Sequence, residues 1–328
     1  MNNVYQDIKD MIGNTPILKI NHMGVKPRVN IFAKLELMNP EGSVKDRVGV
    51  YMIEDAKKRG LLKEGGTIVD ATAGNTGIGI AVAALNQGIR VIFTVPEKFS
   101  IEKQTVMKAL GAEIVHTSRE DGMLGAEQKA EELLKTIPGS ISLRQFRNPA
   151  NPLAHYETTG PEIYSQLDGQ IDYFVAGAGS GGTFSGVVKY LKEQNPSITG
   201  VLADPYGSTI GGGEHFDYNI EGIGNDFIAD TMDITLVDKV IKVTDDEAFE
   251  ASRNLAKHEG ILAGSSSGAA LAAALRLAEE INSGNIVTVF PDRGDRYLSK
   301  GLFDQWQTYM NLQTYTRLIR TTARNSPR

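Results

Sequence analysis

The chain has 328 residues, of which 41% are hydrophobic and 23% charged, so it can form two α/β domains or one large one. Its formal net charge of −6 argues against nucleic-acid binding. No apolar run is long enough to cross a bilayer, and the first residues carry no signal-peptide pattern. The absence of cysteine excludes disulfides, a thiolate nucleophile and a Cys-ligated metal. We therefore expect a cytoplasmic enzyme with no membrane or nucleic-acid partner.

Short apolar runs alternate with helical patterns along most of the chain. The apolar runs predict strands at 31–37, 67–71, 90–95, 113–116, 172–176, 200–203 and 286–290. The helical patterns cover 78–85, 100–110, 121–135, 184–193, 244–258 and 266–281. The helix after Thr244 opens with a capping-box match. This alternation predicts an α/β fold whose parallel sheets are covered by helices on both faces.

The alternation divides into two units, which we expect to be separate α/β domains. The smaller spans residues 36–150, and the larger spans 151–302 together with part of 1–35. The stretch 144–152 holds two Asn-Pro pairs and is the predicted boundary between them. Residues 303–328 form a tail of different composition, with Gln, Tyr, Thr and Arg.

Lys45 is the most informative residue for function. It lies in the run Asn39-Pro40-Glu41-Gly42-Ser43-Val44-Lys45-Asp46-Arg47, which begins as a turn. Ser43 is placed to cap a helix that starts just after it, so Lys45 falls in the first helical turn. The positive end of the helix dipole disfavours a second positive charge there. This favours the neutral amine, which is the form that condenses with an aldehyde.

A glycine-rich loop in mid-chain predicts a phosphate site. The run Gly177-Ala178-Gly179-Ser180-Gly181-Gly182-Thr183 follows a predicted strand and opens a helix, where N–H groups and the helix dipole favour an anion. Its glycines also fit the dinucleotide pattern G-x-G-x-x-G, with Asp204 about 20 residues further on. An NAD-dependent dehydrogenase is therefore a competing hypothesis. Against it, the loop does not open its domain, and a dehydrogenase has no need of the Lys45 segment.

A second motif suggests a hydrolase. The run Gly264-Ser265-Ser266-Ser267-Gly268 matches the G-x-S-x-G nucleophile elbow. That fold needs a histidine after the serine, whereas all five histidines precede it: His22, His116, His155, His215 and His258. The same histidines lack metal-ligand spacing, which also argues against a catalytic zinc ion.

Four segments together resemble the fold-type II pyridoxal-phosphate (PLP) enzymes of the cysteine synthase and cystathionine β-synthase family, over about residues 5–302. In this family Lys45 corresponds to the lysine that forms the Schiff base with PLP. Gly179, Ser180, Gly181, Gly182 and Thr183 resemble the cofactor-phosphate loop. Ser266 resembles the serine that meets the pyridine nitrogen.

The same resemblance assigns a substrate-carboxylate loop to Thr72, Ala73, Gly74, Asn75 and Thr76. It implies that Asn75 also hydrogen-bonds the ring hydroxyl of the cofactor, and that Gln145 helps to bind the substrate carboxylate. Ala73 stands where a serine is common in the family. The implied fold has two parallel-sheet α/β domains of the tryptophan synthase β-like architecture, the smaller one mobile, and the implied assembly is a homodimer.

The implied reaction is a β-replacement. O-acetylserine, or serine, would lose its β-substituent to give an aminoacrylate, with Lys45 as general base for the α-proton. A neutral serine at the pyridine nitrogen gives a weaker electron sink than a carboxylate would, which favours loss of the β-substituent. Homocysteine would then add to form cystathionine, and sulfide is the alternative acceptor, giving cysteine.

The choice of acceptor depends on fewer residues. Glu97-Lys98 and Glu221-Gly222-Ile223-Gly224 are more similar to cystathionine β-synthases, because common cysteine synthases carry Gln before Gly-Ile-Gly. We expect Glu221 at the mouth of the site, where its carboxylate accepts a hydrogen bond from the ammonium of homocysteine. The whole chain is most similar to the bacterial O-acetylserine-dependent cystathionine β-synthases. A non-enzymatic sulfur-carrier or partner-binding role is a third hypothesis.

Overall fold

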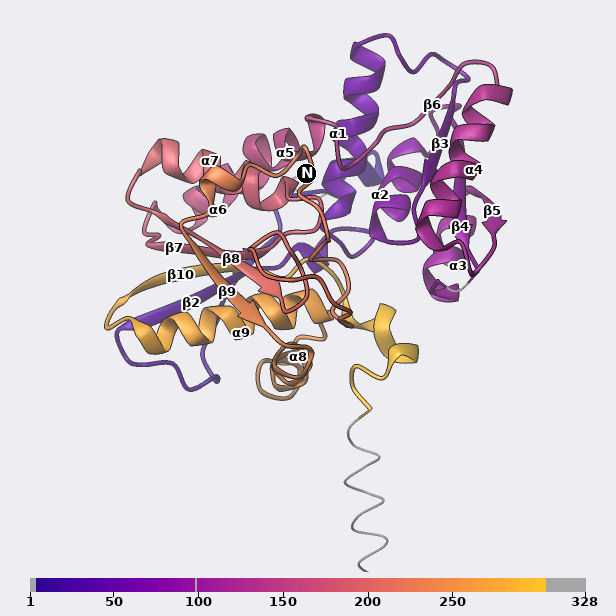
Figure 1. Cartoon of the computed structure of the whole chain (residues 1–328). Helices are drawn as coiled ribbons and strands as arrows, with labels where there is room; N and C mark the ends of the chain where they lie inside the picture. Colours follow the sequence, from indigo (N-terminus) through magenta and orange to yellow (C-terminus); the bar gives the residue numbers. More distant parts are fainter. Residues whose placement is uncertain (1–3, 98, 305–328) are drawn as a thin grey trace, which may run out of the picture.

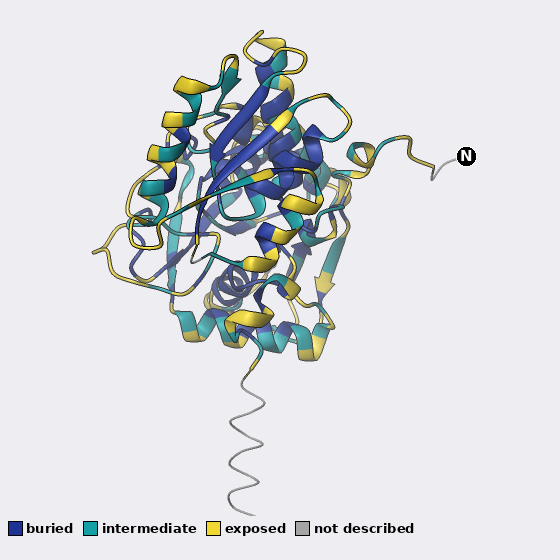
Figure 2. Ribbon diagram, turned by 90° about the vertical axis from the view of Figure 1, so that its right-hand side faces the viewer, coloured by how far each residue is buried: buried dark blue, intermediate teal, exposed yellow. Residues whose placement is uncertain are grey.

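The computed structural model describes residues 4–97 and 99–304. Lys98 and residues 305–328 of the predicted tail lie outside this range. Within it the chain forms two sheets with their own helices, and α1 (Lys45–Lys58) lies between them (Figure 1). The buried residues concentrate in the strands and in the helix faces that pack on them (Figure 2).

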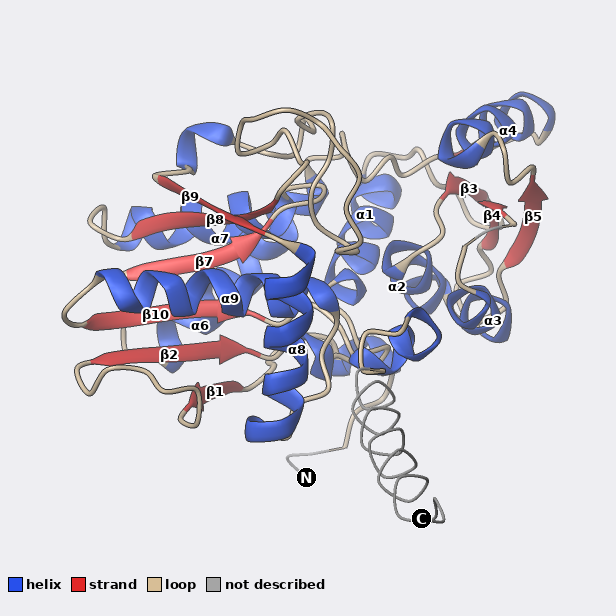
Figure 3. Ribbon diagram, turned by 60° about the horizontal axis from the view of Figure 1, so that its bottom comes forward, coloured by secondary structure: helices blue, strands red, loops and turns tan. Residues whose placement is uncertain are grey.

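The larger sheet, over the described residues, has six strands in the order β1-β2-β10-β7-β8-β9. These are β1 (Ile17–Ile20), β2 (Val29–Lys34), β10 (Gly284–Val289), β7 (Tyr173–Gly177), β8 (Thr199–Pro205) and β9 (Lys239–Val243). Only β1 is antiparallel to its neighbour. Helices α8 (Asp245–Glu259) and α9 (Ser265–Glu280) cover one face, and α6 (Gly160–Gln166) and α7 (Gly182–Gln194) the other (Figure 3). With both faces covered, β8 is buried at every position after its first.

The smaller sheet has the order β5-β4-β3-β6, and all its described pairs are parallel. Its strands are β5 (Glu113–Thr117), β4 (Arg90–Pro96), β3 (Thr67–Ala71) and β6 (Ser140–Ile141). Helices α1, α2 (Asn75–Ala84) and α3 (Ile101–Ala109) pack on one face, and α4 (Gly122–Thr136) packs on the other. Helix α5 (Ala150–Ala154) continues through a π-helical turn (His155–Thr159) into α6. Short 3-10 helices lie at Ile8–Met11, Glu36–Met38, Ile234–Leu236 and Gly294–Lys300.

The predicted α/β class and the helices and strands of the two units are confirmed, most of them within two or three residues. One strand is corrected: the run predicted at 31–37 forms β2 at Val29–Lys34, because the chain turns into a 3-10 helix at Glu36–Met38. The sequence pattern does not reveal β1 and β9. Both lie at edges of the sheet, where charged residues such as Lys19 and Lys242 interrupt the apolar pattern.

Helices α1 and α2 cross in direct backbone contact. A Cβ atom on Gly49 would lie 2.1 Å from the carbonyl oxygen of Gly79, and one on Gly79 would lie 2.2 Å from that of Lys45. Only glycine fits at these two positions. The contact therefore fixes the first turn of α1, which carries Lys45, against the helix that begins at Asn75.

A buried cluster of charges holds α1 to the larger sheet. Arg47 donates to Glu36 on one side, at 2.8 Å from Nε, and to Glu162 on the other, at 2.6 Å from Nη1. Lys34 of β2 also reaches Glu162, at 2.7 Å. Burial opposes ionisation of Glu36, but the charge and hydrogen bonds of Arg47 outweigh it and lower the pKa of Glu36 to about 2. The cluster is thus ionised and joins β2, α1 and α6.

Substitution of Gly79 by alanine tests the helix contact. The added methyl group cannot avoid the Lys45 carbonyl, so α1 must shift. We expect Gly79→Ala to lower the free energy of unfolding by about 1–3 kcal/mol, measured by urea denaturation of the purified protein. Lys58→Ala, at the exposed end of α1, is the control and should change the free energy of unfolding by less than about 0.5 kcal/mol. Unchanged stability of Gly79→Ala would show that the two helices are not in close contact.

Candidate active site

The candidate site lies near the start of α1, between the carboxyl ends of strands from both sheets: β3 of the smaller sheet, and β7 and β10 of the larger. Residues 72–76 follow β3, the glycine loop follows β7, and residues 290–297 follow β10. Ligands of open α/β sheets bind at this edge, because the connecting loops and helix N-termini gather there. A hydrogen bond from Asn75 to Asp292 joins the smaller unit to the larger one at this point, at 2.7 Å.

Lys45 is the first residue of α1, as the turn before it predicts. Ser43 Oγ accepts a hydrogen bond from the Lys45 backbone N–H at 3.2 Å, although Val44 is the residue that precedes the helix. The Lys45 side chain lines a cavity that it shares with the glycine loop. Burial lowers the pKa of Lys45 to about 8, against the opposing charge of Asp292. A considerable fraction of this amine is therefore neutral at mildly alkaline pH.

The glycine loop is arranged to bind an anion. Gly181 has a φ of +79° and precedes α7, so the first N–H groups of that helix have no intrahelical partner. The loop carbonyls are held by the chain instead. That of Ala178 accepts from Gly224 N at 2.7 Å, and that of Gly179 accepts from Asn225 Nδ2 at 2.7 Å. The N–H groups are thus left for a phosphate.

Side chains from α5 and the π-helical turn support this loop. Asn151 donates to Ser180 Oγ at 2.9 Å, and His155 Nε2 lies 3.2 Å from Thr183 Oγ1. Burial lowers the pKa of His155 to about 3, so the imidazole is neutral. The sequence gives no signal for these two residues beyond their types. Asn151 and His155 reach the loop only once α5 packs against α7. The Asn151 side chain then lies against Gly182, which has no side chain of its own.

The predicted carboxylate loop and Gln145 come together. Thr76 donates to Gln145 Oε1 at 2.6 Å, although the two residues are far apart in the sequence. Helix α2 begins at Asn75, directly after Thr72, Ala73 and Gly74, so N–H groups of its first turn face this loop. These residues provide the donors that a carboxylate needs at a helix N-terminus.

The Asn75 side chain is oriented by two residues that sequence reasoning missed. Asp292 Oδ2 accepts from its Nδ2 at 2.7 Å, and Arg296 Nη1 donates to its Oδ1 at 2.5 Å. Tyr297 donates to the same oxygen of Asp292 at 2.5 Å. Burial raises the pKa of Asp292. The signal available in the sequence is the charged run Asp292-Arg293-Gly294-Asp295-Arg296 directly after the apolar strand β10.

Ser266 lies beside the loop that carries Glu221. Ser266 is buried in the first turn of α9, and a Cβ atom on Gly222 would lie 3.8 Å from its Oγ. The Glu221 backbone donates to Ser265 Oγ at 3.0 Å. The Glu221 carboxylate points away from this bond, to Lys103 of α3 at 2.9 Å. The Glu221 carboxylate is therefore already paired, and its placement at the mouth of the site stays a prediction.

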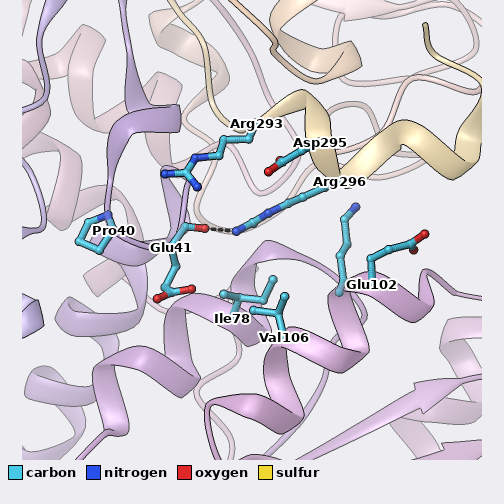
Figure 4. Close-up of a pocket in the computed structure, with 9 residues that line it drawn as sticks. Pro40, Glu41, Ile78, Glu102, Val106, Arg293, Asp295 and Arg296 are labelled. Atoms are coloured by element: carbon cyan, nitrogen blue, oxygen red, sulfur yellow. Dashed lines mark hydrogen bonds between the residues drawn. The ribbon is translucent and has the colours of Figure 1, made fainter.

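Figure 4 shows a second cavity, of about 250 Å³. It lies beside Asn75, because Arg296 in its wall donates to Asn75 Oδ1. It is lined by Pro40, Glu41, Ile78, Glu102, Lys103, Val106, Arg293, Asp295 and Arg296. Arg296 reaches across it to the carbonyl oxygen of Glu41, and Arg293 points toward the same residue (Figure 4). Three acidic and three basic side chains thus line the cavity together with three apolar ones.

The structure disfavours the dehydrogenase hypothesis. Asp204 would have to face the ribose of NAD, but it is fully buried. Its Oδ2 accepts from Lys242 Nζ at 2.6 Å and from Gly211 N at 2.9 Å. The carboxylate therefore has a structural role. Among the described residues, no group of three or more His, Asp and Glu could hold a metal ion, and no helix could span a membrane.

Comparison with known proteins identifies the family. The family model described as "Pyridoxal-phosphate dependent enzyme" matches residues 8–292. The chain belongs to the pyridoxal-phosphate dependent enzymes. It is 52% identical over 302 residues to the O-acetylserine dependent cystathionine beta-synthase of Bacillus subtilis, covering 92% of this chain and 98% of that protein. It is 46% identical over 299 residues to a cysteine synthase of Helicobacter pylori, covering 90% and 98%.

A solved structure agrees with these relatives. The O-acetylserine dependent cystathionine beta-synthase of Helicobacter pylori matches with a TM-score of 0.87 and 45% identity, over 92% of this chain and 99% of that one. The chain is thus a PLP-dependent enzyme of fold type II, and its cofactor is PLP.

The residues present fit this cofactor. A Cβ atom on Gly179 would lie 2.7 Å from the Gly222 carbonyl oxygen, and one on Gly181 would lie 2.4 Å from Met232 Cβ. The loop must therefore be glycine, and its bare backbone can approach a phosphate closely. Within the described residues, Lys45 Nζ donates to no oxygen of the chain, so its amine is available in the cavity that the glycine loop also lines.

Proposed function

We propose that this PLP enzyme catalyses β-replacement on a small amino acid, with O-acetylserine, or serine, as donor and homocysteine as acceptor, to form cystathionine. The observation that carries the proposal is the placement of Lys45, with its lowered pKa, in one cavity with the phosphate loop. The relatives named for O-acetylserine and for cystathionine support this choice of substrates. When bound, PLP withdraws electrons from the substrate α-carbon, so that the α-proton and the β-substituent can leave.

Each part of the site then has a defined role. Lys45 holds the cofactor and later accepts the α-proton at Nζ, for which its lowered pKa is suited. Residues 72–76 and Gln145 hold the donor carboxylate, and Asn75, oriented by Asp292, meets the ring hydroxyl. Gly179, Ser180, Gly181, Gly182 and Thr183 hold the phosphate. Ser266 meets the pyridine nitrogen as a neutral partner.

Cysteine synthesis from sulfide is the second candidate function. It is favoured by one observation: Lys103 already neutralises Glu221, the residue proposed for the homocysteine ammonium. Relatives named cysteine synthase support it as well. We further propose a cytoplasmic homodimer, whose subunit number light scattering of the purified protein would measure.

Lys45→Ala tests the central assignment. The variant lacks the amine that holds the cofactor and accepts the α-proton. We expect the lysine-linked chromophore to be lost and turnover to fall below detection, while the phosphate loop can still retain some cofactor. Absorbance spectra and a cystathionine assay measure the two effects. Full activity in Lys45→Ala would exclude this lysine as the catalytic group.

The smaller unit, residues 36–150, is proposed to move against the larger one. It carries the carboxylate loop, whereas the phosphate loop belongs to residues 151–302, so a bound substrate contacts both. Closure would exclude water from the reacting carbon. Crystal structures with and without a bound donor amino acid should show a change in the angle between the two sheets. Identical angles in both would contradict the proposal.

Glu221→Gln tests the choice of acceptor. A carboxylate at the site mouth can bind the homocysteine ammonium, which sulfide lacks. We expect Glu221→Gln to lower kcat/KM for homocysteine by roughly ten- to a hundredfold, because a charge-assisted hydrogen bond is lost. Steady-state assays with homocysteine and with sulfide, at one donor concentration, measure the change. Equal losses with both acceptors, or none, would remove Glu221 from acceptor binding.

A further inference from the structure

One ion pair joins the smaller unit to the larger one beside the site. Lys103 Nζ, on α3, lies 2.9 Å from Glu221 Oε2, in the loop that passes Ser266. The Lys103 side chain is 6% exposed and that of Glu221 37% exposed. Lys103 also lies over the Tyr297 ring, 4.5 Å from its centroid, and Lys300 Nζ is 3.7 Å from Glu221 Oε1. The pair is therefore buried on its cationic side and open to solvent on its anionic side.

The pair also links the two cavities. Lys103 lines the cavity of about 250 Å³ beside Asn75. Gly222, the residue after Glu221, lines the cavity of Lys45. The ion pair therefore lies next to residues of both cavities.

We propose that an amino-acid thiol binds by inserting into this ion pair. Its ammonium takes the place of Lys103 at Glu221, and its carboxylate takes the place of Glu221 at Lys103. This inference rests on the β-replacement function proposed above and adds to it a binding site for the acceptor carboxylate. Lys103 is then a specificity-determining residue for zwitterionic acceptors.

Charge balance favours this arrangement. Each protein charge exchanges one opposite partner for another, so neither is left unpaired in a partly buried place. Lys300 remains beside Glu221 during the exchange. Glu102, the neighbouring carboxylate on α3, accepts from Ser100 Oγ at 2.6 Å. Sulfide carries neither group of the zwitterion and cannot make the exchange.

A different role for Lys103 predicts the opposite result. If Lys103 only blocks Glu221, its removal frees the carboxylate, and acceptors with an ammonium should react faster. If Lys103 binds the acceptor carboxylate, its removal slows acceptors that carry one. The sign of the change therefore separates the two roles.

The experiment compares three acceptors with sulfide as the reference, all in the holoenzyme. The three are homocysteine, mercaptobutyrate (homocysteine without its amino group) and mercaptopropylamine (homocysteine without its carboxyl group). The variants are Lys103→Met and Lys103→Arg, with Lys108→Met as control. Lys108 is exposed on the same helix, away from the cavity. Absorbance spectra show whether each variant holds PLP.

We expect Lys103→Met to lower the kcat/KM of homocysteine and mercaptobutyrate, each divided by that of sulfide, by roughly ten- to a hundredfold. In the same variant, the ratio for mercaptopropylamine should not fall. Lys103→Arg should retain much of the activity that Lys103→Met loses, and Lys108→Met should match the wild type. A raised or unchanged homocysteine ratio in Lys103→Met overturns the insertion. A wild type that holds PLP and uses sulfide but not homocysteine overturns the proposed acceptor itself, and the insertion with it.

Discussion

The site depends on the close crossing of α1 and α2. Because Gly49 and Gly79 carry no side chain, the backbones touch, and the first turns of the two helices lie side by side. Lys45 begins one helix and Asn75 begins the other. A pair of helix N-termini held together in this way favours anionic groups and a neutral amine, which is the environment that PLP and an amino-acid carboxylate require. Every other element of the site is placed relative to this crossing.

Helix α1 also carries the ion pairs that attach it to the larger sheet. Two residues after Lys45, Arg47 pairs with Glu36 and Glu162, so α1 is anchored by ion pairs, whereas the Lys45 amine makes none within the described residues. Polar contacts join the two units near the site, among them those of Asn75 with Asp292 and of Lys103 with Glu221. Such contacts can break without disturbing either core. This arrangement is consistent with the proposed movement between the two units and with acceptor binding at their junction.

The sequence predicts local features of the site well. The turn and helix around Lys45, the glycine loop and the loop before Asn75 follow from short-range patterns, because turn geometry and helix starts are encoded by neighbouring residues. The partners that orient these groups are not local. Asp292 reaches Asn75, and His155 reaches Thr183, only after the sheets have assembled. The pairing of Glu221 with Lys103 likewise depends on tertiary packing, so the sequence places Glu221 at the site mouth without showing its partner.

The most direct test of this account is to locate the residue that holds the cofactor. Borohydride treatment of the purified holoenzyme reduces the linkage between PLP and a lysine to a stable bond, and peptide mapping by mass spectrometry then finds the modified residue. The account predicts one modified peptide, containing Lys45, and loss of activity in proportion to its formation. Modification of a different lysine, or none in a protein that holds PLP and is active, would contradict it.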